Sequence, residues 1–474
     1  MLSYFRVNDP YRAVGVFLLL ILTRFPFLAS DVPLSLPELN WMLAGERLSE
    51  GWPLYSGLWD NIGPLAALIY ALIEWVFDRS QTVYVILAIL LTTYQAMVFN
   101  IFLLNKKAYN ENTYVPALVY ILVASFFFDF FLLSPVLISL TWILLALRNV
   151  FYRIESRSRD NRILSTGIYL GLATLCYLPS LIFLFSTMIA YFLFASLSFR
   201  RYLLLFYGTA MPLLLAFTYF FLMDAHYAFV NQYLLAFQEL ANDFYIEPLQ
   251  LLYVSIVPLV FLLISAYRLG QLRRFTNQQT KLQQIMFIKI VASLVSLLFV
   301  SELAPYHLLP FVPPLAFFIT HYLLSIRRIL LAELATFLLG LLLVLNAYAF
   351  LFGYFSLARV YDTQQELLTQ TTAYDEVVAG KRVLVMGDNL SVYRNARLAT
   401  PYLDWGLAQK QLSSIEYFED LTSVYANFSR DMPQVIIDLQ GLMPDLQQRL
   451  PLLQQSYRQM PGRESVYLLK EGEN

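Results

Sequence analysis

The chain has 474 residues, of which 59% are hydrophobic and only 14% are charged. Soluble globular proteins have roughly 45–50% apolar and about 25% charged residues, so this composition indicates a protein of the lipid bilayer. The formal net charge of −1 provides no basic field that would attract nucleic acid.

A membrane-spanning helix needs about 20 mostly apolar residues. We expect about eleven such helices, at residues 13–30, 82–104, 113–129, 132–150, 163–179, 181–198, 202–222, 249–267, 284–301, 307–325 and 329–352. One further apolar segment, residues 62–77, is short and carries Glu74. We predict that this segment is a juxtamembrane helix, which lies along the membrane surface and does not cross it.

Lysine and arginine residues in the connecting loops predict the direction of the spans, because cytoplasmic loops carry an excess of both. If residues 62–77 do not cross, Lys106, Lys107 and the arginine-rich loop 148–162 all face the cytoplasm. If they do cross, loop 148–162 faces outward and breaks the rule. We therefore predict a cytoplasmic N-terminus and an extracytoplasmic C-terminal segment.

After Tyr354 the composition becomes that of an ordinary soluble protein. Apolar strand-like segments alternate there with helix-like ones: strands are expected at 382–387, 434–438 and 465–469, and helices at 363–378, 415–428 and 443–457. This alternation predicts a small α/β domain. The expected fold class is thus an all-α polytopic membrane bundle at 1–355, with an extracytoplasmic loop at 31–81, followed by an α/β soluble domain at 356–474.

The first outside loop carries most of the residues that could perform chemistry. In order they are Asp31, Pro37-Glu38, Trp41, Gly51-Trp-Pro-Leu-Tyr55, Asp60 and Pro64. Carboxylates near a membrane surface, beside Trp and Tyr, are suited to a general base or a metal ligand. The same residues would also make an ordinary solvated loop with aromatic anchors at the interface.

The order of these residues resembles the first extracytoplasmic loop of the GT-C glycosyltransferases, which include the protein O-mannosyltransferases and the aminoarabinose transferase of lipid A. In that family an Arg ends the first span. An Asp-Glu pair, an aromatic residue, a Gly-x-Pro-x-Tyr turn, an acid and a Pro follow. The same order is found here in Arg24, Glu38, Trp41, Tyr55, Asp60 and Pro64.

Later segments resemble the same family. Asp129 falls at the next outside turn, where the family places a second acid, and Gly171-Leu-Ala resembles a helix start of the family. Tyr306-His307-Leu-Leu-Pro310 resembles its Arg-Tyr-x-Leu-Pro segment. The chain departs from the family at three positions: Pro37 replaces the first acid of the pair, Tyr177 a usual Lys, and Pro305 the Arg.

The resemblance implies transfer of a sugar from a polyprenyl-phosphate-linked donor to an extracytoplasmic acceptor. Glu38 would deprotonate the acceptor hydroxyl, and Asp31, which is displaced from the family's position, is a further candidate for a catalytic acid. Asp129 would ligate a divalent metal or orient the acceptor. Arg24 and His307 would contact the phosphate.

Four other residues complete the predicted substrate-binding set: Trp41, Tyr55, Asp60 and Tyr306. The departures from the family leave a second hypothesis open, a non-catalytic membrane scaffold or subunit of an envelope assembly or secretion machine, with envelope proteins as partners. A transporter is disfavoured because we find no internal repeat. Either hypothesis predicts a multi-pass protein of the bacterial inner membrane.

Overall fold

The computed structural model describes residues 1–155, 160–235, 245, 247–271, 275–300, 302–352, 367–414 and 417–470. They form two units. The first, which we call the helical unit, comprises Met1–Val32, Gln81–Tyr219 and Phe237–Glu366. The second, the α/β unit, comprises Pro33–Ser80, Phe220–Ala236 and Leu367–Asn474. The domain boundary that we expect at residues 355 and 356 lies outside the described residues.

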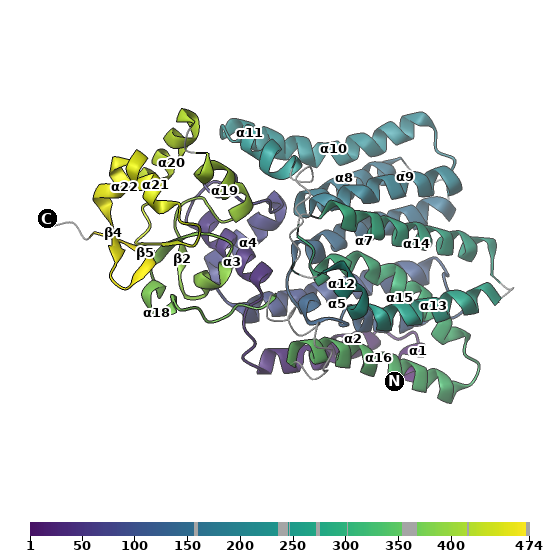
Figure 1. Ribbon diagram of the computed structural model, residues 1–474. Helices are drawn as coiled ribbons and strands as arrows, with labels where there is room; N and C mark the ends of the chain where they lie inside the picture. Colours follow the sequence, from purple (N-terminus) through teal and green to yellow (C-terminus); the bar gives the residue numbers. More distant parts are fainter. Residues whose placement is uncertain are drawn as a thin grey trace. The chain divides into compact units, whose positions relative to one another are not determined.

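The helical unit is built from apolar helices of 5 to 25 residues, and the longer ones run side by side (Figure 1). In chain order they are α1 (Leu2–Arg6), α2 (Arg12–Ala29), α5 (Gln81–Asn105), α6 (Val115–Val123), α7 (Pro135–Glu155), α8 (Asn161–Cys176), α9 (Ile182–Phe194), α10 (Phe199–Leu222), α12 (Pro248–Val254), α13 (Ile256–Gln271), α14 (Asn277–Ser296), α15 (Val312–Ser325) and α16 (Ile329–Phe352). Short 3-10 turns lie between some of them, at η1 (Phe128–Phe131), η2 (Leu178–Leu181), η5 (Leu297–Phe299) and η6 (Pro305–Phe311).

The prediction of a polytopic helical membrane protein is confirmed. Within the described ranges, seven helices are long and apolar enough to span a membrane, or eight if the bent pair α12–α13 is one span. Each of the eleven expected segments coincides with a helix or helix pair, but some of these helices are short. For example, α6 has nine residues before the chain leaves the helix, and α8 ends at Cys176, three residues before Pro179.

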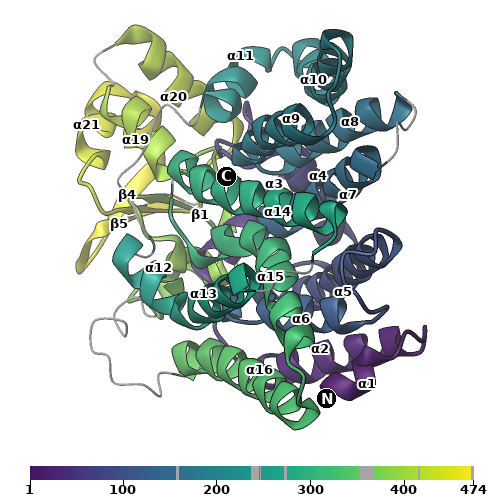
Figure 2. The same ribbon diagram turned by 90° about the vertical axis from the view of Figure 1, so that its right-hand side faces the viewer.

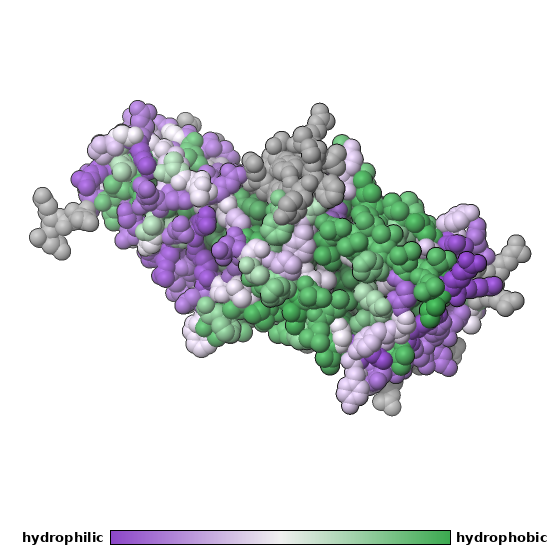
Figure 3. Space-filling view, turned by 90° about the horizontal axis from the view of Figure 1, so that it is seen from below, coloured by the Kyte–Doolittle hydropathy of each residue, from purple (hydrophilic) through white to green (hydrophobic). Residues whose placement is uncertain are grey.

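Hydrophobic side chains form a broad band over the helices of this unit (Figure 3). Exposed leucines of α2 and α16, such as Leu22 and Leu330, contribute to it. Apolar side chains with such exposure are stable when lipid covers them.

Helices α8 and α10 cross at glycine residues. A methyl group added at Gly208 would lie 2.5 Å from the Leu164 carbonyl oxygen, and one added at Gly167 would lie 2.3 Å from that of Leu205. Gly171, which begins the Gly-Leu-Ala motif, similarly faces the Thr209 carbonyl at 2.4 Å. Small residues let helix backbones approach closely inside membranes, so this motif has a packing role.

The α/β unit contains a five-stranded sheet in the order β2-β1-β3-β5-β4. Its strands are β1 (Arg382–Met386), β2 (Arg397–Leu398), β3 (Val435–Asp438), β4 (Tyr457–Met460) and β5 (Arg463–Leu469). Strand β1 pairs in parallel with β2 and β3, whereas β5 is antiparallel to β3 and β4. The helices of this part are α18 (Asp375–Val378), α19 (Trp405–Ser413), α20 (Phe418–Arg430), α21 (Met443–Arg449) and α22 (Pro451–Ser456), with a 3-10 turn η7 at Leu390–Asn395.

A single hydrophobic core joins the sheet to α19, α20 and α21, which lie on one face of it (Figure 2). Leu384 and Ile436 of the sheet pack there with Val424, Phe428 and Leu446. The small α/β domain is therefore confirmed, with the three expected strands in place.

One expected helix of this domain is wrong over its described part. Residues 363–366 of the expected helix 363–378 lie outside the described residues, and of residues 367–378 only Leu367 and Asp375–Val378 are helical. Instead, Leu368 forms an antiparallel bridge with Ser35. A backbone partner from the first loop overrides the local helix preference, which is a weak determinant.

The first loop contributes two packed helices to the α/β unit, α3 (Leu36–Ser49) and α4 (Pro64–Phe77). Helix α4 has 14 residues, about 21 Å of helix, which is too short to cross a bilayer. One of its faces packs inward through Ala66, Tyr70 and Ile73, while Leu72 and Trp75 are exposed. Its position along the membrane surface stays a prediction.

The segment after α10 completes this unit with a short helix, α11 (His226–Phe229), and one π-helical turn, η3 (Val230–Leu234).

Candidate functional site

Arg24 is fully buried near the end of α2 in the helical unit. Its guanidinium donates hydrogen bonds to the carbonyl oxygens of Phe130 (3.3 Å) and Phe131 (3.5 Å) and to the Thr92 hydroxyl (3.3 Å). Across the described ranges no ion pair joins Arg24 to an acid. A buried arginine held by neutral carbonyls keeps its positive charge uncompensated, which is costly unless an anion binds nearby.

Asp129 lies in η1, directly before the two residues whose carbonyls Arg24 binds. Its side chain is buried, and its Oδ2 accepts a hydrogen bond from the Tyr306 N–H at 2.9 Å. Its other oxygen, Oδ1, has no hydrogen-bond partner in the described part of the chain. Asp129 thus joins the turn η1 to the turn η6.

His307 and Tyr177 stack in the same unit, with ring centroids 5.6 Å apart and an angle of 25° between the ring planes. Nδ1 of His307 lies 3.1 Å from the Ala304 nitrogen and 3.2 Å from the Ala304 oxygen, so it is occupied by the start of η6. This leaves Nε2 as the ring nitrogen available to a ligand. The Tyr177 hydroxyl is buried without a hydrogen-bond partner in the described residues.

Sequence reasoning missed Lys289 of α14. The side chain is buried, and its Nζ donates to the Ser186 hydroxyl at 2.8 Å and the Thr187 hydroxyl at 3.1 Å of α9. A single lysine within the expected span 284–301 was the signal, because a charge at that depth is expensive and marks a functional candidate.

In the α/β unit, Glu38 lies in the first turn of α3 and is fully buried. Ser35 caps this helix by accepting a hydrogen bond from the Glu38 N–H at 3.2 Å. A carboxylate is favoured at a helix N-terminus, so the fold alone gives Glu38 a local reason to be there. One turn further, Trp41 is buried and stacks on Tyr70 of α4, with ring planes 6° apart.

In the same unit, the side chains of Tyr55 and Asp60 both form hydrogen bonds with the backbone of Ile62. The Tyr55 hydroxyl donates to the Ile62 carbonyl at 2.7 Å, and Asp60 Oδ1 accepts from the Ile62 N–H at 2.7 Å. Tyr55 has a φ of 69°, which is uncommon for a residue with a side chain. Its ring is buried in an aromatic cluster with Phe220, Phe229 and Tyr233.

Asp60 has an unusual protonation equilibrium. Burial, together with the negative charge of Asp404, raises the pKa of the Asp60 carboxyl from 3.8 to about 7. Hydrogen bonds from Asn40 and from the Ile62 backbone partly oppose this rise. A carboxyl with a pKa near neutrality is suited to proton transfer, although a structural role produces the same shift.

The predicted site residues therefore fall into two groups. Arg24, Asp129, Tyr306 and His307 come together around η1 and η6 in the helical unit, whereas Glu38, Trp41, Tyr55 and Asp60 belong to the α/β unit. Asp31 is an exposed residue in the turn that follows α2. Within the described residues, no group of three or more His, Cys, Asp or Glu residues could hold a metal ion.

No protein-family model matches the chain, and neither does any curated protein sequence. Solved structures do match it. The structure of ArnT from Cupriavidus metallidurans bound to undecaprenyl phosphate is 10% identical, with a TM-score of 0.57 over 97% of this chain and 96% of ArnT. Its apo state gives 11% identity and a TM-score of 0.58 over 97% and 98% of the two chains.

The oligosaccharyltransferase AglB from Archaeoglobus fulgidus, in complex with an inhibitory peptide and a dolichol-phosphate, is 9% identical. Its TM-score is 0.50 over 98% of this chain and 74% of AglB. Both proteins belong to the GT-C superfamily. This chain has the GT-C fold. The resemblance seen in the sequence is thereby confirmed for the fold, and the roles of individual residues stay predictions at this level of identity.

Proposed function

We propose that this GT-C-fold protein is a membrane glycosyltransferase that moves a sugar from a polyprenyl-phosphate-linked donor to an extracytoplasmic acceptor. The main support is the match to ArnT over nearly the whole of both chains, in a structure that contains undecaprenyl phosphate. The dolichol-phosphate in the AglB complex points to the same class of lipid carrier. The expected location is the bacterial inner membrane, with the N-terminus in the cytoplasm.

In the proposed reaction, the acceptor hydroxyl oxygen forms a bond to the anomeric carbon of the sugar, and the bond from that carbon to the phosphate oxygen breaks. A carboxylate accepts the hydroxyl proton, and the lipid phosphate leaves with the bonding electrons. We assign the base to Glu38, which is buried and lies at a helix start. Asp31 is a second candidate for a catalytic carboxylate in this proposal.

The leaving phosphate needs positive charge or hydrogen-bond donors around it. We assign this role to Arg24, whose charge has no acidic partner among the described residues, and to His307 through Nε2. Asp129 would orient the acceptor or a divalent metal through its Oδ1, which has no partner in the described residues. Trp41, Tyr55, Asp60 and Tyr306 would shape the substrate-binding surfaces.

One observation favours the scaffold hypothesis as a second candidate. Tyr177 and Pro305 stand where the family has basic residues, and Tyr177 contacts the His307 ring. Pro37 similarly stands where the family has its first acid. A protein that had lost the reaction but kept its partners would tolerate these changes.

The test replaces Glu38→Gln and Asp129→Asn, singly and together, in a strain that lacks the chromosomal copy. Exposed Glu419→Gln and Asp445→Asn serve as matched controls. Envelope glycans and lipid-linked sugars are then profiled. A transferase predicts that the deletion and both site variants lose the same glycan and accumulate the donor, while the controls do not. If the site variants complement the deletion fully, the scaffold hypothesis holds.

A further inference from the structure

Helix α3, which carries the proposed base Glu38, is held at its start by the last part of the chain. The Thr369 N–H donates to the Leu34 carbonyl at 2.8 Å, and Ser35 pairs with Leu368 in an antiparallel bridge. The contacts lie just before the helix, whose first turn contains Glu38. Residues more than 330 positions apart in sequence therefore fix where α3 begins.

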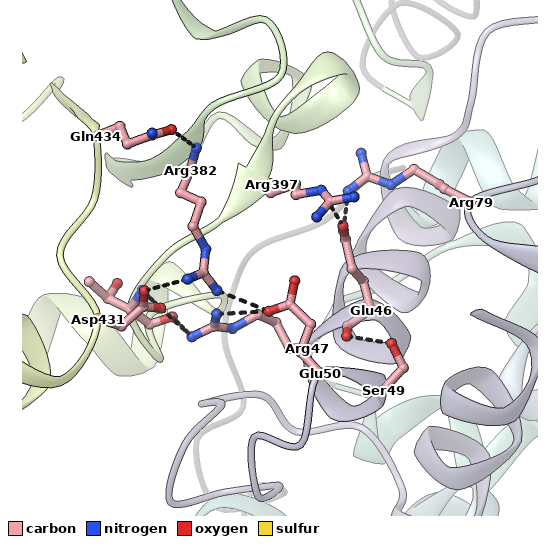
Figure 4. Close-up of polar contacts among 10 residues, drawn as sticks. Glu46, Arg47, Ser49, Glu50, Arg79, Arg382, Arg397, Asp431 and Gln434 are labelled. Atoms are coloured by element: carbon pink, nitrogen blue, oxygen red, sulfur yellow. Dashed lines mark hydrogen bonds and ion pairs between the residues drawn. The ribbon is translucent and has the colours of Figure 1, made fainter. Parts of the chain in front are cut away.

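The other end of α3 is held by ion pairs to the C-terminal part of the same unit, the α/β domain that contains the sheet (Figure 4). Arg47 donates to Asp431 at 2.6 Å, and the two side chains are only 1% and 3% exposed. Asp431 also accepts hydrogen bonds from the Thr400 N–H at 2.9 Å and pairs with Arg382 of β1 at 3.2 Å. Arg382 in turn pairs with Glu50, the residue after α3, at 3.0 Å.

A second cluster lies beside the first and is more exposed. Glu46 of α3 pairs with Arg79, which follows α4, and with Arg397 of β2 at 3.2 Å. The same arginine of the loop, Arg79, also donates to backbone carbonyls of the α/β domain at Tyr393 and Ala396. Exposed ion pairs contribute little on their own, so the buried pair of Arg47 and Asp431 is expected to hold α3 more strongly than this cluster.

Besides its ion pair with Asp431, Arg47 contacts the Trp52 ring. Its guanidinium lies 4.2 Å from the centre of the Trp52 ring, and Arg430, the neighbour of Asp431, lies 4.7 Å from the same ring. Such cation–π contacts are favourable when the cation is shielded from water. Trp52 belongs to the Gly-Trp-Pro-Leu-Tyr turn, so one arginine connects the helix, the turn and the α/β domain.

We infer that Asp431, acting through Arg47 on the α3 helix, is a positioning residue that places Glu38. The two ends of one α-helix move together, and Arg47 lies about 13 Å along the axis from Glu38. If Asp431 loses its charge, buried Arg47 keeps only its longer ion pair with the more exposed Glu50 at 3.4 Å, and the loss of its buried partner is unfavourable. Helix α3 then gains freedom to shift, and a shift of about 1 Å at a reacting group lowers a rate by on the order of 100-fold.

This inference rests on the proposed function for its catalytic consequence, but its structural part can be measured separately. The full chain in lipid nanodiscs is compared as wild type, Asp431→Asn, Asp431→Glu and Asp445→Asn. Asp445 is an exposed carboxylate in α21, so its neutral variant controls for the loss of one charge in the same domain.

Hydrogen–deuterium exchange of residues 36–49 is the first measurement. Asp431→Asn is expected to speed exchange there by at least about tenfold, with α5 and α15 unchanged, and Asp431→Glu to restore slow exchange. The second measurement is transfer with undecaprenyl-phosphate sugar as donor. Asp431→Asn is expected to lower kcat by about 10- to 100-fold while the donor KM stays within about twofold.

Unchanged exchange in α3 would overturn the inference, whatever the activity. Faster exchange with unchanged kcat would show that the contact between Asp431 and Arg47 has only a structural role, which also overturns the inference. If the wild type transfers no sugar, the proposed function fails while the exchange result still decides whether Asp431 fixes α3. Should Asp431→Asn not fold, Arg382→Gln at the partly exposed side of the cluster replaces it, with Arg458→Gln as its control.

Discussion

Tyr177 and His307 stack at 5.6 Å, although they come from segments 130 residues apart. Both fall at positions where the resemblance leads us to look for phosphate-binding residues. His307 uses Nδ1 at the backbone of Ala304, so only Nε2 can serve a ligand. The two ring nitrogens therefore have different expected roles, which substitutions can separate.

We predict that His307→Asn and His307→Gln behave differently. An Asn amide can replace Nδ1 at Ala304 but not Nε2, whereas a Gln amide reaches the position of Nε2. His307→Asn should raise the donor KM about tenfold, because a hydrogen bond to a charged group contributes about 1.5–3 kcal/mol. His307→Gln should keep the donor KM within about threefold while lowering thermal stability. Equal effects of the two variants would contradict the assignment of Nε2 to the phosphate.

The stability of the protein should depend on the protonation of Asp60. The pKa of this carboxyl is about 7 in the folded state and 3.8 ordinarily, so the folded state binds one more proton between these pH values. The stabilisation is therefore present at low pH and is lost as pH rises through about 7, by on the order of a few kcal/mol. Asp60→Asn should flatten the melting temperature between pH 5 and 8 in detergent, which we would follow by thermal shift.

Asp404→Asn tests the cause of that pH dependence. Asp404 caps α19 by accepting from the Leu407 N–H, and Asn preserves a cap of this kind. Its negative charge also raises the pKa of Asp60. Removing the charge should move the pH-dependent loss of stability to lower pH. A transition that stays in place would show that the charge of Asp404 does not contribute to the raised pKa of Asp60.

The crossing of α8 and α10 should tolerate no side chain at Gly208. A methyl group there would meet the Leu164 backbone oxygen at 2.5 Å, so Gly208→Ala must separate the helices. We expect a loss of about 1–3 kcal/mol, visible as a lower melting temperature. Gly270 of α13 is the matched control, because a methyl group there meets nothing within 4 Å. Gly270→Ala should be neutral or slightly stabilising, since Ala favours helix.

Lys289 should be replaceable for stability but not for function. Lys289→Met removes a buried charge while filling a similar volume, and such replacements are often neutral or stabilising. The Ser186 hydroxyl keeps a hydrogen bond to the Phe183 carbonyl in the variant. We expect an equal or higher melting temperature and reduced complementation of the deletion strain. Full complementation would show that Lys289 serves packing alone.

The sequence predicted the bundle and the α/β domain because hydrophobic length and strand–helix alternation are local signals. The expected strands at 382–387, 434–438 and 465–469 coincide with β1, β3 and β5. Strand β2 has only two residues, which is too short for an alternating pattern to predict it. Its pairing partner lies fifteen positions earlier in the chain. The expected helix around Leu368 was wrong for a similar reason, because its partner Ser35 lies at the other end of the chain.

The candidate site could be predicted only in part. The order of acids and aromatics in the first loop named Glu38, Tyr55 and Asp60, and the structure places all three in one unit, buried. The raised pKa of Asp60 depends on Asp404, and no local pattern links the two residues. The role of Asp431 could not be predicted from the sequence either, because its partner is a buried arginine 384 positions earlier.

The attachment of α3 to residues 368, 369 and 431 has a consequence for how the protein is made. Translation delivers the first loop long before the α/β domain emerges, so a nascent chain carries α3 without the partners that hold both of its ends. The first loop is therefore held at both ends of α3 only when the C-terminal part of the chain has been made and folded. Prematurely terminated chains would therefore insert into the membrane with α3 unattached at both ends, and their first loop would be more open to proteolysis.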